Sequence, residues 1–482
     1  MPTVNPRRWW ALAVLATAQF MVIMDTSIIG VALPQMQKDL GFSQGELQWV
    51  FNAYVIAFGG LLLLGGRLSD LLGARRVFTA GWTVLIGGSV IAAAAQTAWV
   101  EVAGRAVQGV GGALIAPAAM TLLMTLFAHD PRELGKAMAL YGAAAPAGGT
   151  AGVFLGGVFT EWLSWPWVFI IYIPIGLATL AATGLLPTVA PRRGAIDVLG
   201  AAAVTAGLAL AVFAVVRAPD TGWASTRTVL ELLGAGALLV VFFAIQKSVR
   251  EPLMPLGIWR VPRLGSANWA MTLLGAAWIP MWYFLNLYLQ QVLGYGAFAS
   301  GAALLPMTVL LMVFMTAITA RLLARVGAKP LIGGGLLVLA LGLVWLSAVE
   351  PSGSFLVDVL PASLVAALGM SLAYIPAMMA AMAGAPREQA GLASGIVNTT
   401  YQIGSALGLA ALTALATSQG AGRLGDLAAL TDGFSAAFTA AAVIAAIGGL
   451  STLLLMRTDK SAAAAARQEQ PEHEAPGEQV GV

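Results

Sequence analysis

Long apolar stretches separated by short polar loops recur along the whole chain. Each stretch is continuous and long enough for a helix to cross a hydrocarbon core about 30 Å thick. Strands of a membrane barrel would instead alternate polar and apolar positions, so the pattern predicts an all-α integral membrane protein. The fourteen predicted transmembrane helices cover residues 9–33, 47–66, 77–95, 102–126, 135–160, 166–186, 197–217, 228–246, 265–290, 299–320, 331–349, 357–382, 391–417 and 433–456.

The composition agrees with a membrane protein and narrows its chemistry. Of the 482 residues, 59% are hydrophobic and 10% are charged, an apolar content too high for a soluble core. The chain has no cysteine and two histidines, so disulfides, thiolate metal ligands and a cysteine nucleophile are excluded. It has no phosphate-binding G-x-x-x-x-G-K-[ST] loop that would power primary transport. We therefore expect no enzyme activity, metal site, bound cofactor or nucleic-acid partner.

Lysine and arginine are distributed unevenly between the loops of the predicted topology. With both termini inside, 20 of the 25 Lys and Arg residues fall on the cytoplasmic side, 4 fall outside and 1 lies within a span. Cytoplasmic loops of membrane proteins carry such an excess of positive charge. We therefore expect a multi-pass protein of the cytoplasmic membrane, surrounded by the lipid bilayer, with both termini cytoplasmic.

A weak internal repeat divides the chain. The segment GRLSDLLGARR at residues 66–76 recurs as ARLLARVGAKP at residues 320–330, an offset of 254. Both copies lie between the second and third helices of a six-helix unit, and repeated halves around a central site are typical of secondary transporters. The predicted parts are an N-terminal six-helix half (1–190), two inserted helices with their loops (191–262), a C-terminal six-helix half (263–456) and a disordered cytoplasmic tail (457–482).

Asp25 is the one carboxylate deep within a predicted span. Sixteen positions separate it from Trp9, which at about 1.5 Å per residue is roughly 24 Å into a core about 30 Å thick. A charge at that depth costs about 2.5–3.5 kcal/mol on insertion scales and persists where it faces a protein interior or a water-filled cavity. Asp25 is therefore the predicted functional centre. The alternative is a charge solvated at the outer end of its helix.

The loop at residues 66–76 resembles the signature loop of the major facilitator superfamily, and further motifs resemble its fourteen-span drug/proton antiporter family. The resemblance covers most of residues 10–456 and implies the major facilitator fold, two six-helix halves plus two inserted helices. It also implies that the loop is a latch on the cytoplasmic face that breaks and re-forms during alternating access. The alternative is a plain turn with positive-inside charges. The predicted latch residues are Gly66, Asp70, Gly73, Arg75 and Arg76.

Two intramembrane charges lie in motifs that resemble those of the same family. MDTSIIGVALP at residues 24–34 is similar to the span-1 motif whose acid takes part in proton coupling, and GRAVQGVGG at residues 104–112 resembles a span-4 motif with an embedded arginine. Asp25 and Arg105 both fall in the outer half of the bilayer at similar depth. We expect them to form a charge pair or a proton-linked relay. The alternative is a fixed pair that only holds the bundle together.

Span 5 carries small residues at a spacing of four. Gly148, Gly152 and Gly156 share one helix face, where small residues let helix backbones approach closely. Together with Gly157 they resemble the antiporter motif of the family, although Val153 stands where that motif has proline. The motif match is therefore incomplete and leaves the direction of transport open.

Polar and aromatic side chains within the spans are candidates to line a substrate cavity. Each has the alternative of a helix-packing hydrogen bond or an interfacial position. Other acids, including Glu101 and Glu161, fall near the outer ends of spans. One embedded carboxylate favours neutral, zwitterionic or monocationic amphiphiles over dications. The cavity candidates are Gln19, Asn52, Gln108, Trp282, Asn286, Tyr374, Asn398 and Tyr401.

Together these features predict a secondary active exporter of small amphiphilic drugs or antibiotics that uses the proton gradient. Two halves rock around a central cavity, and Asp25 takes a proton from outside and releases it inside as the substrate moves outward. A dedicated exporter or importer of one metabolite on the same fold is the alternative, for example for self-resistance to a secondary metabolite. A membrane enzyme or receptor is disfavoured because the sequence contains no catalytic constellation.

Overall fold

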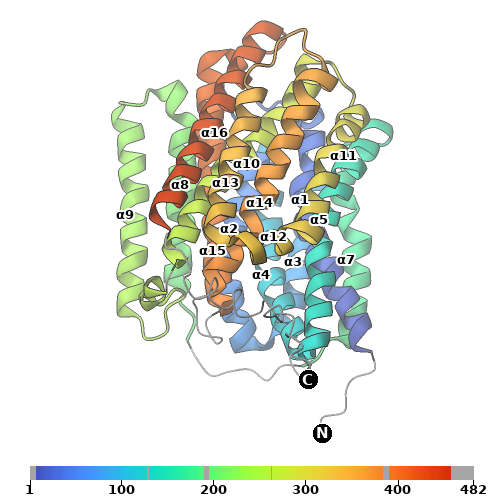
Figure 1. Ribbon diagram of the computed structural model, residues 1–482, viewed down its shortest axis with the longest axis vertical. Helices are drawn as coiled ribbons and strands as arrows, with labels where there is room; N and C mark the ends of the chain where they lie inside the picture. Colours follow the sequence, from blue (N-terminus) through green and yellow to red (C-terminus); the bar gives the residue numbers. More distant parts are fainter. Residues whose placement is uncertain (1–6, 128–129, 189–194, 262, 384–389, 457–482) are drawn as a thin grey trace, which may run out of the picture.

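The computed structural model describes residues 7–127, 130–188, 195–261, 263–383 and 390–456, and their regular structure is helical (Figure 1). The predicted all-α architecture is confirmed. The α-helices are α1 (Arg8–Leu40), α2 (Trp49–Leu68), α3 (Ala74–Ala93), α4 (Ala98–Phe127), α5 (Pro131–Trp162), α6 (Trp167–Ile170), α7 (Tyr172–Ala181), α8 (Val198–Thr221), α9 (Thr226–Ser248), α10 (Leu264–Leu287), α11 (Ala297–Val313), α12 (Thr319–Val326), α13 (Ala328–Leu346), α14 (Leu360–Ala383), α15 (Ala390–Ala416) and α16 (Leu427–Leu455). Short π-turns or 3-10 turns adjoin them at η1 (Ser69–Gly73), η2 (Ala182–Leu185), η3 (Leu256–Arg260), η4 (Tyr288–Val292), η5 (Phe314–Ile318), η6 (Phe355–Val359) and η8 (Thr417–Ala421).

Twelve helical segments of the described chain are long and apolar enough to cross a membrane. The fourteen stretches predicted from the sequence differ from this count at two places. Trp49–Ala93 is one run of 45 residues that contains two predicted spans, and α15 is not among the twelve. α15 includes the polar sequence Asn398 to Gln402, which lowers its mean hydropathy. The protein is therefore a multi-pass helical membrane protein with twelve candidate spans.

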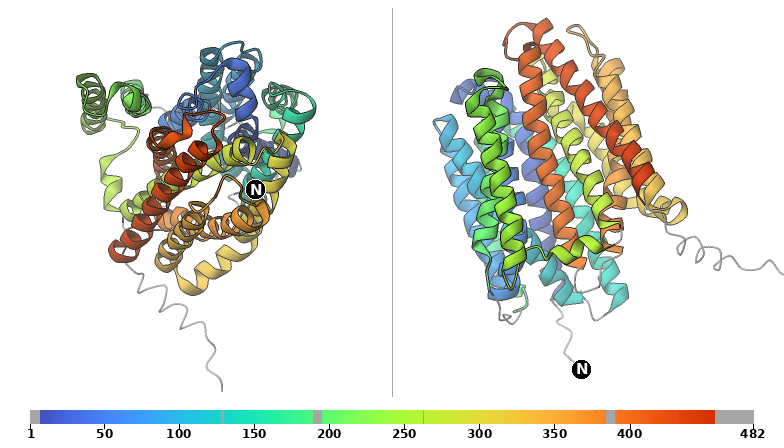
Figure 2. Two further views of the ribbon diagram at one scale, coloured as in Figure 1. Left: turned by 90° about the horizontal axis from the view of Figure 1, so that it is seen from above. Right: turned by 90° about the vertical axis from the view of Figure 1, so that its left-hand side faces the viewer.

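The long helices stand side by side along the long axis of the molecule (Figure 1, Figure 2). α1 begins at the lower end in Figure 1. α8 and α9 pack on each other, and α8 also contacts α2 and α15. α9 stands at the edge of the bundle, and 17% of its most apolar 18-residue stretch is buried. In the Leu264–Val292 span, which contains α10, 83% of the corresponding stretch is buried. α9 is therefore peripheral, and α10 belongs to the core.

The predicted latch segment at residues 66–76 is mostly helical rather than a loop. Gly66 lies within α2 and Asp70 within the π-turn η1, so neither residue lies in a loop. The break falls at Gly73, whose φ of 93° lies in the left-handed region that favours glycine. Gly327, 254 residues later, has a φ of 86° between α12 and α13. The backbone break thus recurs at the offset of the sequence repeat.

Candidate functional site

The two charged residues predicted within spans 1 and 4 meet in the structure. Asp25 lies in the middle of α1 and is 1% exposed, and Arg105 lies in the second turn of α4 and is fully buried. Asp25 Oδ2 is 2.7 Å from Arg105 Nη1, so the side chains form an ion pair. An isolated charge in a low-dielectric interior is unfavourable, which is why these opposite charges are found together.

Three further groups hold the Arg105 guanidinium. Nε donates to the Val50 carbonyl oxygen at 2.9 Å and Nη1 donates to Gln108 Oε1 at 2.7 Å, while the Tyr54 ring centre lies 4.6 Å away. Gln108 in turn donates to Ser89 Oγ at 2.8 Å. Gln108 therefore belongs to the charge site rather than to the cavity for which it was predicted. Among the described residues, Arg105 Nη2 has no hydrogen-bond partner.

Glycines of α5 lie against the helix that carries Asp25. If Gly152 were replaced by a residue with a Cβ, that atom would lie 2.8 Å from the Met24 carbonyl oxygen. A Cβ at position 156 would lie 2.6 Å from the Ile28 carbonyl oxygen. Side-chain carbons do not approach backbone oxygens so closely, so glycine is what permits this helix contact. The glycine stripe against α1 consists of Gly148, Gly152 and Gly156.

The neighbouring Gly157 faces a different helix. A Cβ on it would lie 3.0 Å from the Ala297 carbonyl oxygen at the start of α11, so Gly157 is not part of the glycine stripe. Val153, which occupies the proline position of the motif, is fully buried. Gly301 of α11 packs against it so closely that a Cβ at position 301 would lie 2.6 Å from the Val153 carbonyl oxygen. α5 thus packs on α1 with one face and on α11 with another.

Glu101 is a second buried carboxyl, which the sequence reasoning placed near the outer end of its span. It lies in the first turn of α4 and is 0% exposed, and neither of its carboxyl oxygens has a hydrogen-bond partner in the described part of the chain. It precedes Arg105 by four residues, so the two side chains share one helix face. In the sequence, its position four residues before the embedded Arg105 could have identified Glu101 as a second buried acid.

A cavity of about 240 Å³ lies between helices from both parts of the chain. Tyr54, Trp278 and Gln402 help to line it, and no described lining side chain is an Asp, Glu, Lys or Arg. Tyr54 also covers the guanidinium of Arg105, so one ring connects the cavity with the charge site. The predicted cavity residues that line it are Gln19, Trp282, Tyr374, Asn398 and Tyr401.

Asn52 and Asn286 lie outside this cavity. Asn52 is 1% exposed and donates to Gln48 Oε1 at 3.3 Å. Asn286 is fully buried and donates to the Trp282 carbonyl oxygen at 2.8 Å. Both side chains bond one turn back along the chain, as buried polar groups do where other partners are few. Their predicted cavity position is corrected accordingly, as it is for Gln108.

Arg67 connects the end of α2 with the chain around α8 and α9. It forms an ion pair with Glu251 and donates to the Ala195 carbonyl oxygen at 3.3 Å. The Ala195 amide also donates to Glu251 Oε2 at 2.5 Å. The predicted latch residues that form no ion pair with any described residue are Asp70, Arg75 and Arg76. The contact between α2 and the chain around α8 and α9 is therefore made by Arg67, which is not among the predicted latch residues.

Three glutamines join distant parts of the chain at the upper end of the bundle. Gln44 donates to Gln291 Oε1 at 3.2 Å, and Gln291 donates to Gln37 Oε1 at 2.9 Å. Beside them, Gln290 donates to the Val31 carbonyl oxygen at 2.9 Å. The glutamine cluster (Gln37, Gln44 and Gln291) thus connects α1 and the loop after it to η4 through neutral hydrogen bonds.

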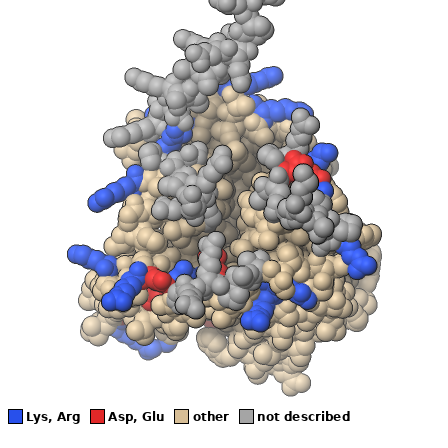
Figure 3. Space-filling view, turned by 90° about the horizontal axis from the view of Figure 1, so that it is seen from below, with Lys and Arg blue, Asp and Glu red and all other residues tan. Residues whose placement is uncertain are grey.

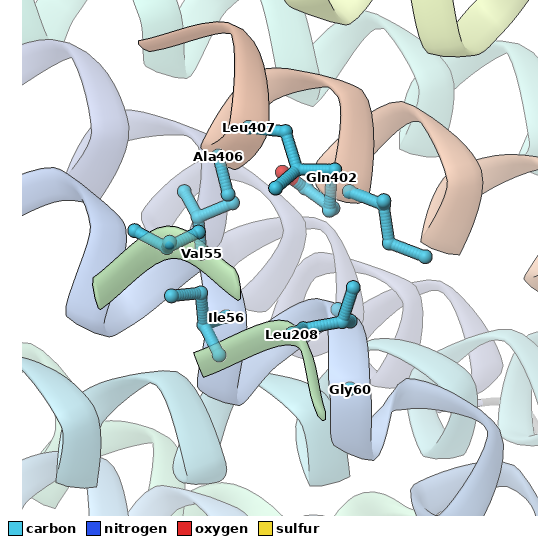
Figure 4. A pocket seen from close by; sticks show the side chains of 10 residues that line it. Val55, Ile56, Gly60, Leu208, Gln402, Ala406 and Leu407 are labelled. Atoms are coloured by element: carbon cyan, nitrogen blue, oxygen red, sulfur yellow. The ribbon is translucent and has the colours of Figure 1, made fainter. Parts of the chain in front are cut away.

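A smaller crevice lies where α2, α8 and α15 meet (Figure 4). Its volume is about 10 Å³, and Val55, Leu208 and Ala406 contribute to an almost wholly apolar wall. A space of that size holds at most one water molecule, and an apolar one stays dry. It is therefore a packing gap rather than a binding site.

A helical membrane bundle with a buried charge pair beside a cavity is typical of secondary transporters. Comparison with protein families matches the Major Facilitator Superfamily over residues 15–409. The chain belongs to this superfamily, and it is a transporter rather than an enzyme. Transporters of this superfamily need no cofactor.

Several relatives match most of the chain, among them an antibiotic export protein and an antibiotic resistance protein. The chain is 38% identical to the cephamycin export protein CmcT of Amycolatopsis lactamdurans, with 90% of this chain and 89% of that protein covered. It is 37% identical to the puromycin resistance protein pur8 of Streptomyces alboniger, with 92% and 89% covered. Among solved structures, a mutant of the nucleoside transporter NupG matches with a TM-score of 0.65 at 14% identity, over 92% of this chain and 99% of that one. The last likeness shows a shared fold.

Proposed function

We propose that this transporter exports small amphiphilic compounds, drugs and antibiotics among them, in exchange for protons. The observation that carries the proposal is the buried Asp25–Arg105 ion pair, which the Tyr54 ring connects to the cavity. A carboxylate inside a membrane bundle is a default candidate for binding a transported proton. The names of the two relatives, cephamycin export and puromycin resistance, support a drug or antibiotic as the substrate.

The chain crosses the membrane fourteen times in this proposal. Trp49–Ala93 has 45 residues, about 68 Å of helix at 1.5 Å per residue, which is more than twice the thickness of a core of about 30 Å. Its backbone break at Gly73 fits two crossings joined at the lower end. α15 packs on α10 and α2, which lets its polar residues face protein instead of lipid.

The distribution of basic side chains supports cytoplasmic termini. Lys and Arg side chains surround the lower face of the molecule (Figure 3), and α1 begins at this end. Arg75 and Arg76 lie at the start of α3, at the same end. An excess of positive charge marks the cytoplasmic side. The upper end would then face outward from the cytoplasmic membrane.

Transport proceeds by alternating access of two halves, residues 1–190 and 263–456, with residues 191–262 inserted between them. In the conformation described, the glutamine cluster joins the halves at the upper end, while the latch residues form no ion pair with described residues at the lower end. This combination fits a state closed to the outside. Neutral hydrogen bonds contribute about 0.5–1.5 kcal/mol each, so the cluster can open and close in every cycle.

Protonation of Asp25 is coupled to the cavity through Tyr54. A proton removes the charge of Asp25 and weakens its hold on Arg105, whose guanidinium lies 4.6 Å from the Tyr54 ring centre. Because Tyr54 lines the cavity, a shift of the guanidinium changes the cavity wall. The glycine stripe holds the α5 backbone against α1, so movement of α1 carries α5 with it.

The cavity wall favours uncharged or singly charged amphiphiles. Aromatic side chains such as Trp282, Tyr374 and Tyr401 supply apolar contact area, and Gln19 and Asn398 supply hydrogen-bonding groups. A dication would enter without a carboxylate partner, since no described lining side chain is acidic. One positive charge over an aromatic face gains about 0.5–2 kcal/mol, which accommodates a monocation.

Proton-coupled uptake into inverted membrane vesicles tests the proposed function. Energised wild-type vesicles should accumulate a lipophilic fluorescent monocation and release protons when it is added. Asp25→Asn keeps the size of the side chain but cannot bind and release a proton, so energised transport should be lost while substrate binding is retained. Glu231→Gln on the peripheral α9, where Glu231 pairs only with Arg227 in the described structure, is the matched control. Equal transport by wild type and Asp25→Asn would refute the role of Asp25.

A dedicated exporter of one antibiotic is the second candidate function. The names of CmcT and pur8 each record a single antibiotic. A panel of chemically unrelated antibiotics and dyes in the same vesicles decides between the two. Transport of several classes would favour multidrug efflux, and transport of one class would favour a dedicated exporter.

A further inference from the structure

We propose that Glu101 is a second proton-binding carboxyl and that it shares Arg105 with Asp25. Arg105 pairs with one carboxylate at a time, and the other carboxyl holds a proton. The inference rests on the proposed proton-coupled transport and adds a residue that the family motifs did not single out. Its basis is three fully or almost fully buried ionisable side chains of which only one is positive.

The contacts of α4 leave both Glu101 and Arg105 with unused hydrogen-bonding capacity. Neither carboxyl oxygen of Glu101 has a partner among the described residues, and neither does Arg105 Nη2. A spacing of four residues on a helix brings the Cβ atoms to about 5–6 Å, within reach of long side chains. Arg105 can therefore turn from Asp25 to Glu101 by rotation of its side chain, without movement of a helix.

The charges around Glu101 require one of the two acids to be neutral. Arg105 and Asp25 are the charged groups within electrostatic reach of Glu101. Tyr54 of α2 and Ser89 of α3 approach Arg105 and Gln108 but bring no charge. Two ionised carboxylates would leave a net negative charge among side chains that are almost fully buried, which a low-dielectric interior does not tolerate. Since Arg105 pairs with Asp25 in this structure, the proton resides on Glu101.

Glu101 lies at the start of α4, near the upper end of the bundle. Thr97, Trp99 and Val100, which directly precede Glu101, are exposed. Arg105 lies one turn deeper along the helix. Glu101 is thus the acid of this cluster nearest to the side proposed to face outward.

The proton can be followed through each step. In the starting state, Arg105 pairs with ionised Asp25 and Glu101 carries the proton, so the three charges sum to zero. Glu101 then transfers its proton to Asp25 as Arg105 turns to the new Glu101 carboxylate, and the sum stays zero. As Asp25 releases this proton to the inside, Arg105 returns to it and Glu101 binds a proton from outside. Only one carboxylate is therefore ionised at each step, and the sum again stays zero.

Proton-driven transport by Glu101→Gln is the first test. The ratio of proton-driven uptake to counterflow of labelled substrate, which uses no pH gradient, corrects for differences in folding and expression. We expect this ratio to fall at least about tenfold, because Arg105 has no second carboxylate to which it can turn. Glu101→Asp keeps an ionisable group and should recover part of the ratio, and Glu231→Gln should equal wild type. A wild-type ratio and pH profile in Glu101→Gln would overturn the inference.

Infrared spectroscopy of the carboxyl groups gives a second test that does not depend on transport. Wild type should show the absorbance of a protonated buried carboxyl at neutral pH. That band should disappear in Glu101→Gln, which lacks the acid, and also in Asp25→Asn, where Arg105 pairs with Glu101 and ionises it. A band that persists in Asp25→Asn would show that Glu101 is protonated independently of Asp25 and would overturn the sharing of Arg105. This comparison needs only wild type and Asp25→Asn, so it holds even if Glu101→Gln fails to fold.

Transport by wild type, Asp25→Asn and Glu101→Gln distinguishes a wrong role for Glu101 from a wrong proposed function. If wild type shows no proton-driven transport, or Asp25→Asn matches it, proton coupling at Asp25 is refuted. If those two results are as proposed and Glu101→Gln alone behaves as wild type, only the role of Glu101 is refuted.

Discussion

The two parts of the chain that enclose the cavity differ in where they bury charge. Asp25, Glu101 and Arg105 are buried in the first part, whereas no described Asp, Glu, Lys or Arg beyond residue 263 is buried. The second part contains the span that includes α10, the most deeply buried of the twelve candidate spans. It contributes aromatic cavity walls, among them Trp282 and Tyr374.

This difference shows that two parts around one cavity can carry unequal chemistry. Both parts share the latch-like break at Gly73 and Gly327, yet the ionisable groups are concentrated in one part and lie outside the cavity lining. Protons and substrate would then bind at neighbouring but separate places, connected by Tyr54. Mutations should therefore be able to affect one process without the other.

Removing the central cation should cause the greatest damage. Arg105→Met leaves Asp25 buried without its partner, and breaking a buried ion pair destabilises a protein by about 3–5 kcal/mol. Thermal unfolding of the purified protein in detergent should show a marked fall in transition temperature. The double variant with Asp25→Asn contains neither charge and should recover most of the loss. A double variant no more stable than Arg105→Met would contradict the pairing.

Two glycines of α5 should respond to alanine with opposite signs. A Cβ on Gly152 would lie 2.8 Å from the Met24 carbonyl oxygen, whereas a Cβ on Gly142 would have no neighbour within 4 Å. Gly152→Ala should destabilise by about 1–3 kcal/mol through overpacking. Gly142→Ala should stabilise by up to about 1 kcal/mol through helix propensity. Equal effects of the two substitutions on thermal unfolding would show that the glycine stripe does not require close packing on α1.

A cavity residue of the second part should alter substrate recognition without altering proton coupling. Tyr374 lines the cavity and its ring centre lies 5.4 Å from that of Tyr401. Tyr374→Ala should raise the KM for aromatic substrates by about tenfold, with the number of protons released per substrate unchanged. Tyr374→Phe retains the ring and is the matched control. Loss of proton release in Tyr374→Ala would contradict the separation of the two sites.

The ion pair at the lower end should have the smallest effect. Arg67 and Glu251 are both partly exposed, and such pairs contribute about 0.2–1 kcal/mol. A double-mutant cycle with Arg67→Gln and Glu251→Gln, followed by thermal unfolding, measures this coupling. A coupling energy several times larger would mean that the pair fixes the position of α8 and α9.

Some features of the site could be predicted because they depend only on distance along a helix. The depth of Asp25 and Arg105 follows from a rise of about 1.5 Å per residue, and the two residues do meet at 2.7 Å. The glycine stripe follows from its four-residue spacing, and its members do lie on one face against α1. The depth of each residue along the bundle axis could therefore be predicted from the sequence.

The sequence by itself determined the membrane class, most of the helices and the similar depth of Asp25 and Arg105, because continuous apolar stretches and helical rise fix what crosses the membrane and at what depth. The tertiary structure decided which way each side chain faces. It buried Glu101 beside Arg105 and turned Asn52 and Asn286 away from the cavity. Helices that are apolar on nearly every side have no polar face to indicate which side meets lipid, a neighbour or a cavity. Only the packing of the complete bundle sets that rotation.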